Sequence, residues 1–303
     1  MNRISFPRRT YADFSNPITE LIEVRRKMLP GHPFVFDLHN SEFLSPLLLC
    51  GSAAFAKRWT EDGHEVKVDI RANDPQMRNY LHSINYPDGF WNVDLSFEAR
   101  RRLVTLQSRN HVPLIGFSAT DKEDQTREQL IQALEDLLIK QCHMKGQVLM
   151  AMKYFLAELT GNIGYHAGRG SGFVMAQYNL EQECLDVAIA DTGQGLLGSY
   201  TSSGFFKPAN DVEALKLALS GQSTKYDGTS RGFGIPTSRR MLVHGMNGAF
   251  FLWSGDSCLF YTKQRETIYQ FKDGTSYPGC YFALRIPTRL PPTFNYYNFL
   301  DRG

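Results

Sequence analysis

The sequence predicts an α/β protein with two domains. Residues 31–118 alternate short hydrophobic runs with amphipathic stretches, which is typical of strands and helices that follow one another in a small α/β domain. Residues 126–290 place two long helical segments before a series of strands, which favours a sandwich with helices on one face of a mixed sheet. A polar stretch at 119–125 predicts a linker, and 303 residues is an ordinary length for two domains.

The first domain follows residues 1–30, which are polar and basic and are expected to form an arm or a short helix. Ser45 and Pro46 are typical of the N-cap and first position of a helix, because the serine oxygen accepts a free backbone N–H and proline has none to satisfy. This helix is expected to end near Trp59. The other elements predicted here are strands at 34–38, 65–70 and 112–117 and a helix at 75–81.

The second domain begins with two predicted helices, at 126–140 and 146–168. Strands are then predicted at 172–180, 184–190, 248–253, 257–262 and 280–286, with further helices at 212–219 and 235–243. Residues 291–303 are expected to form a C-terminal tail.

Composition narrows the function classes. The formal net charge is only +2 and the Arg/Lys clusters are short and scattered, so there is no direct evidence for nucleic-acid binding. No apolar stretch has membrane-spanning length, so no membrane partner is expected. The five cysteines are odd in number and contain no CxxC pair, which predicts free thiols and a cytoplasmic location.

A first motif lies on the helix predicted at 146–168. Glu158, Asn162 and His166 are four residues apart and therefore share one helix face. Phe155, Leu159 and Ile163 form the neighbouring apolar stripe. A carboxylate, an amide and an imidazole in one row suit a polar ligand, although a solvent-facing helix surface gives the same pattern.

A second motif follows the hydrophobic strand at 184–190, where Asp191 is succeeded by Gly193 and Gly195. An aspartate at a strand end can accept a hydrogen bond from an exocyclic amine, and glycines let a ligand approach the backbone. A tight turn would use the same residues.

The third motif is Gly232-Phe233-Gly234, which ends a polar loop just before the helix predicted at 235–243. Backbone N–H groups at such a junction bind phosphate well. A GxG sequence alone is also found in plain loop-to-helix turns. The chain contains no Walker A sequence, and the dinucleotide-binding fingerprint is incomplete.

In this order, the three motifs resemble the N-box and two glycine boxes of the GHKL superfamily, which comprises gyrase, the heat-shock chaperone ATPases, histidine kinases and MutL. The resemblance covers about residues 125–288. It implies the Bergerat fold, an α/β sandwich that holds ATP and Mg²⁺ between a sheet edge, the N-box helix and a mobile lid, here residues 196–230.

The resemblance also implies roles for individual residues. Asn162 would coordinate Mg²⁺, Asp191 would accept the adenine amino group, Gly193 would let the base approach, and the lid would begin at Gly195. Glu158 occupies the position of the general base, which orients a water molecule for attack on the γ-phosphate.

Phosphate contacts are implied for the second glycine box and for nearby basic side chains. Gly232 and Gly234 would offer backbone N–H groups, with Phe233 between them. The basic candidates are His166, Lys225 and Arg231.

The N-terminal domain more weakly resembles a STAS domain, the fold of anti-sigma-factor antagonists. In that family a serine at the helix start can be phosphorylated, so Ser45 is either such a residue or a helix cap.

Three functions follow from these resemblances. The first is an ATPase or ATP-driven switch in protein–protein signalling, which needs a protein partner and is compatible with a homodimer. The second is a serine/threonine kinase of the anti-sigma type, in which Glu158 activates a serine hydroxyl. The third is a nucleotide-sensing adaptor without turnover. His143 is not in the sequence context of a histidine-kinase phosphoacceptor.

Overall fold

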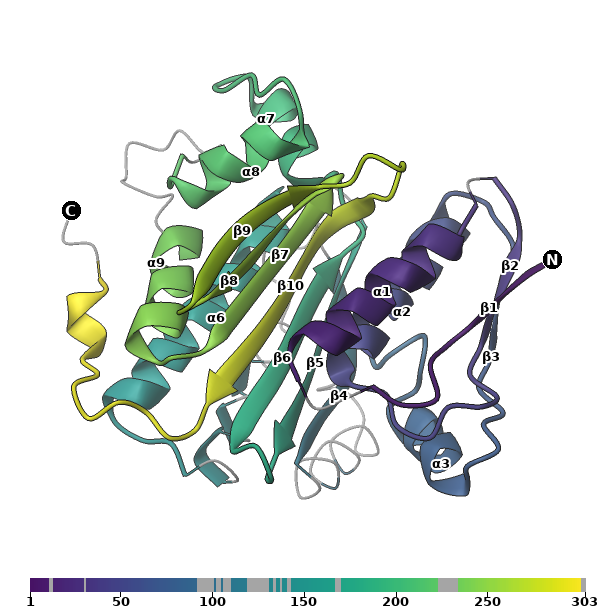
Figure 1. Ribbon diagram of the computed structural model, residues 1–303, viewed down its shortest axis with the longest axis horizontal. Coiled ribbons are helices and arrows are strands. Elements are labelled where there is room, and N and C mark those ends of the chain that lie inside the picture. Colours follow the sequence, from purple (N-terminus) through teal and green to yellow (C-terminus); the bar gives the residue numbers. More distant parts are fainter. Residues whose placement is uncertain are drawn as a thin grey trace.

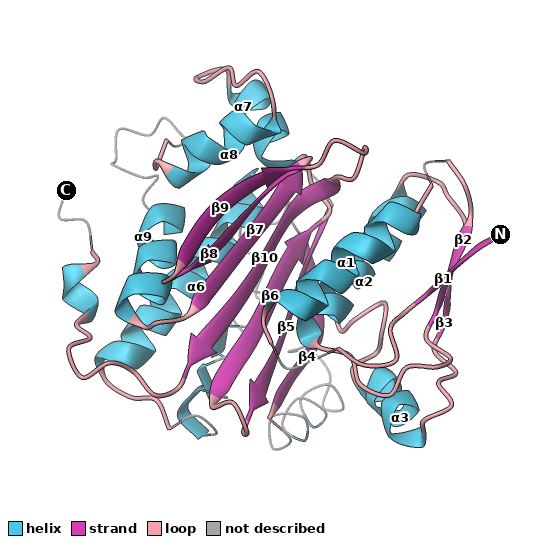
Figure 2. Cartoon of the chain, in the orientation of Figure 1, coloured by secondary structure: helices cyan, strands magenta, loops and turns pink. Residues whose placement is uncertain are grey.

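A computed structural model describes residues 1–300 of the chain except 11–12, 30, 92–100, 102–104, 106–109, 119–130, 133–134, 137, 141–142, 167–169 and 223–233. The architecture is mixed α/β, with a three-stranded parallel sheet and a seven-stranded antiparallel sheet (Figures 1 and 2). Most of the helix predicted at 126–140 and the linker at 119–125 lie outside the described residues.

The small sheet has the strand order β1-β2-β3, with β1 at Asn2–Ser5, β2 at Phe34–Asp37 and β3 at Val66–Asp69. Parallel neighbours need a crossover, and the helices α1 (Ser15–Lys27) and α2 (Pro46–Glu61) provide the two crossovers. A third helix, α3 (Pro75–Ser83), follows β3. The segment 1–30 therefore contributes a strand and a helix to this N-terminal unit.

Ser45 is a helix cap, as its sequence context predicts. Its hydroxyl oxygen accepts a hydrogen bond from the Leu47 N–H at 3.2 Å, and Pro46 is the first residue of α2. The serine is only 5% exposed. The buried Ser45 hydroxyl therefore acts as the N-cap of α2.

The large sheet has the order β4-β5-β6-β10-β7-β8-β9 and every neighbouring pair is antiparallel, so the mixed sheet expected from sequence is wrong. The strand predicted at 112–117 is present as β4, which pairs with β5 in the large sheet. The edge strand β9 was not predicted, because it is largely polar and exposed. The strands are β4 (His111–Ser118), β5 (Ser171–Asn179), β6 (Cys184–Asp191), β7 (Ala249–Gly255), β8 (Ser257–Thr262), β9 (Arg265–Gln270) and β10 (Tyr277–Pro287).

Helices cover both faces of this sheet, which corrects the expectation of helices on one face. Figure 1 shows α6 (Gln147–His166) and α9 (Gly234–Arg240) on one face and α1 and α2 on the other. Alternate strand residues enter the two cores: Val174 and Val187 pack with α6, whereas Phe173 and Ala188 pack with the N-terminal unit. Burial on both faces accounts for the almost continuous hydrophobic sequence of β6.

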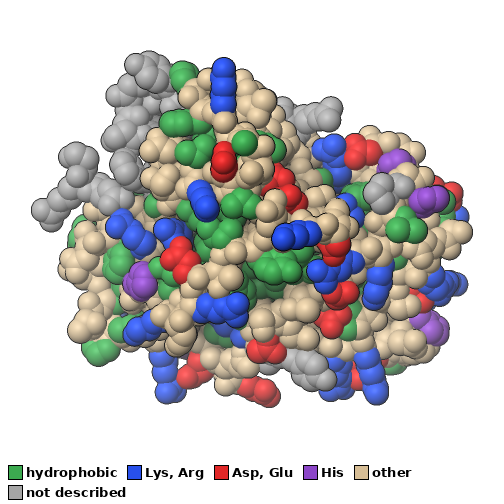
Figure 3. Space-filling view, turned by 45° about the horizontal axis from the view of Figure 1, so that its top comes forward, with side chains coloured by type: hydrophobic (Ala, Val, Ile, Leu, Met, Phe, Trp, Pro, Cys, Tyr) green, Lys and Arg blue, Asp and Glu red, His purple; other side chains and the backbone are tan. Residues whose placement is uncertain are grey.

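Two short helices, α7 (Gly195–Ser203) and α8 (Asp211–Leu219), lie at one end of the sheet, within the segment expected to be the lid. Helix α9 continues into a π-helical turn at Met241–Gly245, and a 3₁₀ turn at Tyr296–Asn298 lies in the expected tail. Figure 3 brings the α7–α8 end toward the viewer and shows basic and acidic side chains intermixed on this face. In the described ranges, no helix is long and apolar enough to cross a membrane.

Candidate functional site

Asp191 is the last residue of β6 and is almost fully buried, with 2% of its surface exposed. Its Oδ1 accepts a hydrogen bond from the Gly193 N–H at 2.8 Å, and its Oδ2 accepts one from the Cys280 N–H at 3.0 Å. Burial raises the pKa of this carboxyl to about 6, against the lowering effect of the two hydrogen bonds. A carboxylate has about four acceptor positions, and these two backbone hydrogen bonds occupy one on each oxygen.

The loop after Asp191 packs tightly against β7 and β10. Gly195 has a φ of +69°, and a Cβ built on it would lie 2.8 Å from Ser254 Oγ and 3.2 Å from the Gly279 carbonyl oxygen. Ser254 also accepts a hydrogen bond from the Leu196 N–H at 2.9 Å. Gly195 is therefore required for both conformation and space, and the loop has a fixed path into α7.

The described part of α6 contains two residues of the predicted polar face and two of the predicted apolar stripe; the Phe155 side chain lies outside the described part. Leu159 and Ile163 are buried in the core between α6 and the sheet, whereas Glu158 and Asn162 are half-buried. His166 is the last residue of α6, and its side chain lies outside the described part of the chain. Glu158 and Asn162 are thus partly accessible one helical turn apart on α6.

Gly234, the first residue of α9, lies directly against Glu158. A Cβ built on Gly234 would lie 2.4 Å from Glu158 Oε2 and 3.3 Å from its carboxyl carbon. The glycine therefore leaves the space that the glutamate carboxylate occupies. Two motifs that are more than seventy residues apart in the sequence thus meet in the fold.

The first glycine box approaches the same region through α7. Helices α6 and α7 are in contact, and so are α6 and α9. Leu196, one residue after Gly195, and Ile235, one residue after Gly234, both pack at the edge of the core that contains Leu159. Four predicted phosphate-site residues lie outside the described residues: Lys225, Arg231, Gly232 and Phe233.

Asn162 is the residue predicted to bind Mg²⁺. Within the described part of the chain, no group of three or more His, Cys, Asp or Glu side chains is placed to hold a metal ion. Mg²⁺ bound to a nucleotide keeps several water ligands and takes its other oxygens from phosphates and one or two protein groups. A half-buried amide one helical turn after Glu158 fits that requirement.

Sequence reasoning missed three residues that shape the site. Cys280 supplies a backbone donor to Asp191 from β10, and burial raises the pKa of its thiol. Ser254 anchors the loop from β7, and Thr192 is fully buried between Asp191 and Gly193. For Cys280, the sequence offered one local indication of a close contact: the preceding residue is Gly279, where a Cβ would collide with the Asp191 backbone.

Comparison of the chain with protein-family models, with curated proteins and with solved structures found no match.

Proposed function

We propose that this chain binds ATP with Mg²⁺ in a Bergerat-type sandwich and hydrolyses it as a switch in protein–protein signalling. The N-terminal unit would be STAS-like in this proposal. The free thiols of Cys50, Cys184 and Cys258 support a reducing, cytoplasmic location.

The observation that carries the proposal is the contact of the Glu158 carboxylate with Gly234. It supports a common site for the N-box and the second glycine box. Asp191 is a buried acceptor at the start of the loop that leads into α7, and α7 contacts α6. An adenine acceptor, a metal-binding amide and a carboxylate near a glycine-rich turn are the groups that an ATP site needs.

The proposed mechanism assigns one task to each group. Asp191 accepts the adenine amino group and fixes the base. Asn162 would hold Mg²⁺ through its side-chain oxygen, and the ion would supply positive charge to offset that of the phosphates. Glu158 accepts a proton from a water molecule aligned with the γ-phosphate, so that the water attacks in line and ADP leaves.

The fate of the γ-phosphate tests the proposal. The chain is incubated with γ-labelled Mg·ATP, and free phosphate and labelled protein are measured together. Release of phosphate that is lost in Glu158→Ala, with ATP binding retained, supports the ATPase. Asn162→Ala is expected to weaken Mg²⁺-dependent binding.

The other outcomes each name a different function. Label on a serine or threonine of a protein would replace the ATPase with the anti-sigma type of kinase. Binding without turnover would leave a nucleotide-sensing adaptor, and absence of binding would overturn the site itself.

A further inference from the structure

The last turn of α2, in the N-terminal unit, reaches the loop that carries Asp191. Arg58 Nη1 donates a hydrogen bond to the Thr192 carbonyl oxygen at 2.8 Å. Each oxygen of the Glu61 carboxylate accepts a hydrogen bond from a hydroxyl group. The donors are Thr192 Oγ1 at 3.1 Å and Ser171 Oγ at 3.2 Å. We call these three hydrogen bonds the α2–loop contact.

The α2–loop contact completes the hydrogen bonding of a fully buried residue. Thr192 is 0% exposed. Its N–H donates to the Ser171 carbonyl oxygen at 2.9 Å, and its Oγ1 accepts from the Ser171 N–H at 2.9 Å. Its carbonyl oxygen and its hydroxyl proton are both bonded by α2. Removal of α2 side chains therefore leaves buried polar groups of Thr192 without these partners, which is costly.

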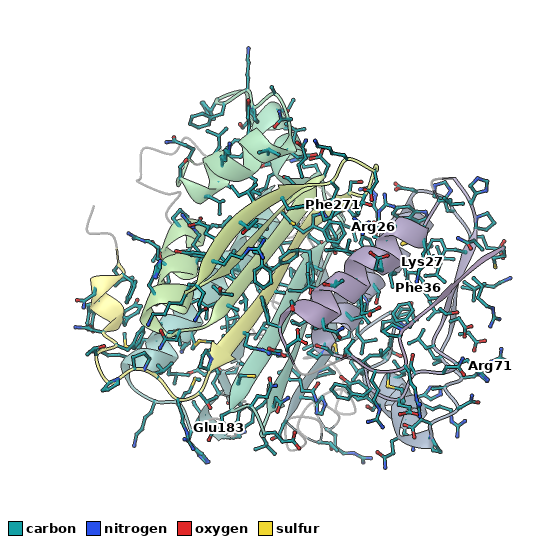
Figure 4. The ribbon with its side chains drawn as sticks, in the orientation of Figure 1. Arg26, Lys27, Phe36, Arg71, Glu183 and Phe271 are labelled. Carbon is teal, nitrogen blue, oxygen red and sulfur yellow. The ribbon has the colours of Figure 1, made fainter. Side chains whose placement is uncertain are left out.

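The N-terminal unit also contacts the strand on the other side of Asp191. Arg25, on α1, donates from Nε to the Ser276 carbonyl oxygen at 2.7 Å. Arg26 forms an ion pair with Asp273 at 2.9 Å and lies over the Phe271 ring (Figure 4). These residues lead into β10, whose Cys280 N–H binds Asp191. Both segments that hold the Asp191 carboxylate are thus fastened to the same unit.

We propose that Arg58 and Glu61 are positioning residues for the nucleotide site, so that the placement of α2 sets its affinity for ATP. This inference rests on the proposed function. Thr192 is bonded between α2 and β5, and its neighbours Asp191 and Gly193 form the adenine end of the pocket. A ligand or protein partner that shifts α2 in the N-terminal unit would shift the Asp191 loop with it. The N-terminal unit is then the regulatory input of the ATPase.

The test compares Glu61→Ala and Arg58→Ala with a matched control, Glu65→Ala. Glu65 is exposed just before β3 in the same unit and forms an ion pair with Lys67 at 2.8 Å. Affinity for Mg·ATP and for Mg·GTP is measured for each purified variant. We expect Kd for ATP to rise about tenfold in the two test variants, with a smaller preference for ATP over GTP, because each variant removes one charge-assisted hydrogen bond to Thr192. The control is expected to bind like the wild type.

A merely structural role would lower stability without changing selectivity between the two bases. The Thr192→Val background adds a second check, because it already lacks the hydroxyl that Glu61 accepts. In that background Glu61→Ala is expected to change Kd less than twofold. Equal tenfold losses in both backgrounds would contradict the proposed route through Thr192.

Amide hydrogen exchange separates this inference from the proposed function. In Glu61→Ala, exchange in the segment 191–196 is expected to be faster without any nucleotide present. Unchanged exchange, or unchanged ATP affinity in both test variants, overturns the inference. A wild-type chain that binds no ATP overturns the proposed function, and faster exchange in Glu61→Ala would then still support the positioning of the loop by α2.

Discussion

Alanine at position 234 places a methyl group where the Glu158 carboxylate lies. The new Cβ would be 2.4 Å from Oε2, whereas ordinary van der Waals contact begins at 3.4 Å. The carboxylate oxygen must therefore move by about 1 Å, as an order-of-magnitude estimate from carbon–oxygen contact distances. The side chain can move this far because its contacting atoms are at the end of a half-buried glutamate.

The expected consequence is a loss of catalysis without a loss of folding. A misplacement of about 1 Å at a reacting group costs roughly 100-fold in rate, or about 2.7 kcal/mol of transition-state stabilisation. Gly234 is the first residue of α9 and its φ is not positive, so the backbone there accommodates alanine. Gly234→Ala is therefore expected to fold with nearly unchanged stability and to hydrolyse ATP about 100-fold more slowly.

The assay measures kcat by phosphate release and Kd by titration with Mg·ATP. Gly161→Ala is the matched control, because Gly161 lies on α6 three residues after Glu158 and a Cβ there meets no atom within 4 Å. The control is expected to keep the wild-type kcat. A Gly234→Ala variant that turns over at the wild-type rate would refute the claim that Glu158 acts from its position against Gly234.

Three further predictions concern stability. Because burial raises the pKa of Asp191 from 3.8 to about 6, the native state holds a proton that the unfolded chain releases over this range. Its contribution to the free energy of unfolding therefore falls by about 3 kcal/mol as the pH rises from about 4 to 6. The difference in unfolding free energy between wild type and Asp191→Asn, measured in urea, should change by that amount between pH 4 and pH 7. A difference that stays constant with pH would contradict the burial argument. Arg285 binds the buried Asp186 through two hydrogen bonds of 2.7 Å, so Arg285→Ala is expected to cost roughly 3–5 kcal/mol in urea unfolding, whereas a loss below 1 kcal/mol would show that the pair is not needed. Phe55 on α2 is fully buried beside Trp253 and Tyr277, so Phe55→Ala should cost roughly 3–5 kcal/mol and lower one cooperative thermal transition, whereas two separate transitions would show that the two sheets fold independently.

The local part of the site was predictable from sequence. A hydrophobic strand that ends in Asp191 and two glycines indicates a buried acceptor followed by a tight path, and both are present. The four-residue spacing of Glu158 and Asn162 beside an apolar stripe likewise indicates their shared face on α6. These features depend on residues close together in the chain, where periodicity and turn chemistry operate.

The remaining features depend on contacts between distant segments. Arg58 and Thr192 are 134 residues apart, and nothing in either local pattern indicates that they meet. The strand predicted at 112–117 is present as β4, but its pairing with β5 had no local signal, because a strand's partner is decided by distant residues rather than by sequence neighbours. The two-sided burial of the sheet did have a signal, the unbroken hydrophobic run of β6, which is typical of a strand covered on both faces.

The central claim is that Asp191 is the adenine acceptor of an ATP site. Calorimetric titration of wild type and Asp191→Ala with Mg·ATP and Mg·GTP, at pH 8 where the carboxyl is ionised, tests it most directly. The account predicts that the wild type binds ATP in preference to GTP. It also predicts that Asp191→Ala, folded by circular dichroism, binds ATP at least tenfold more weakly and without that preference, because a hydrogen bond to a charged group is lost. Equal ATP affinity and selectivity in the two proteins would contradict it.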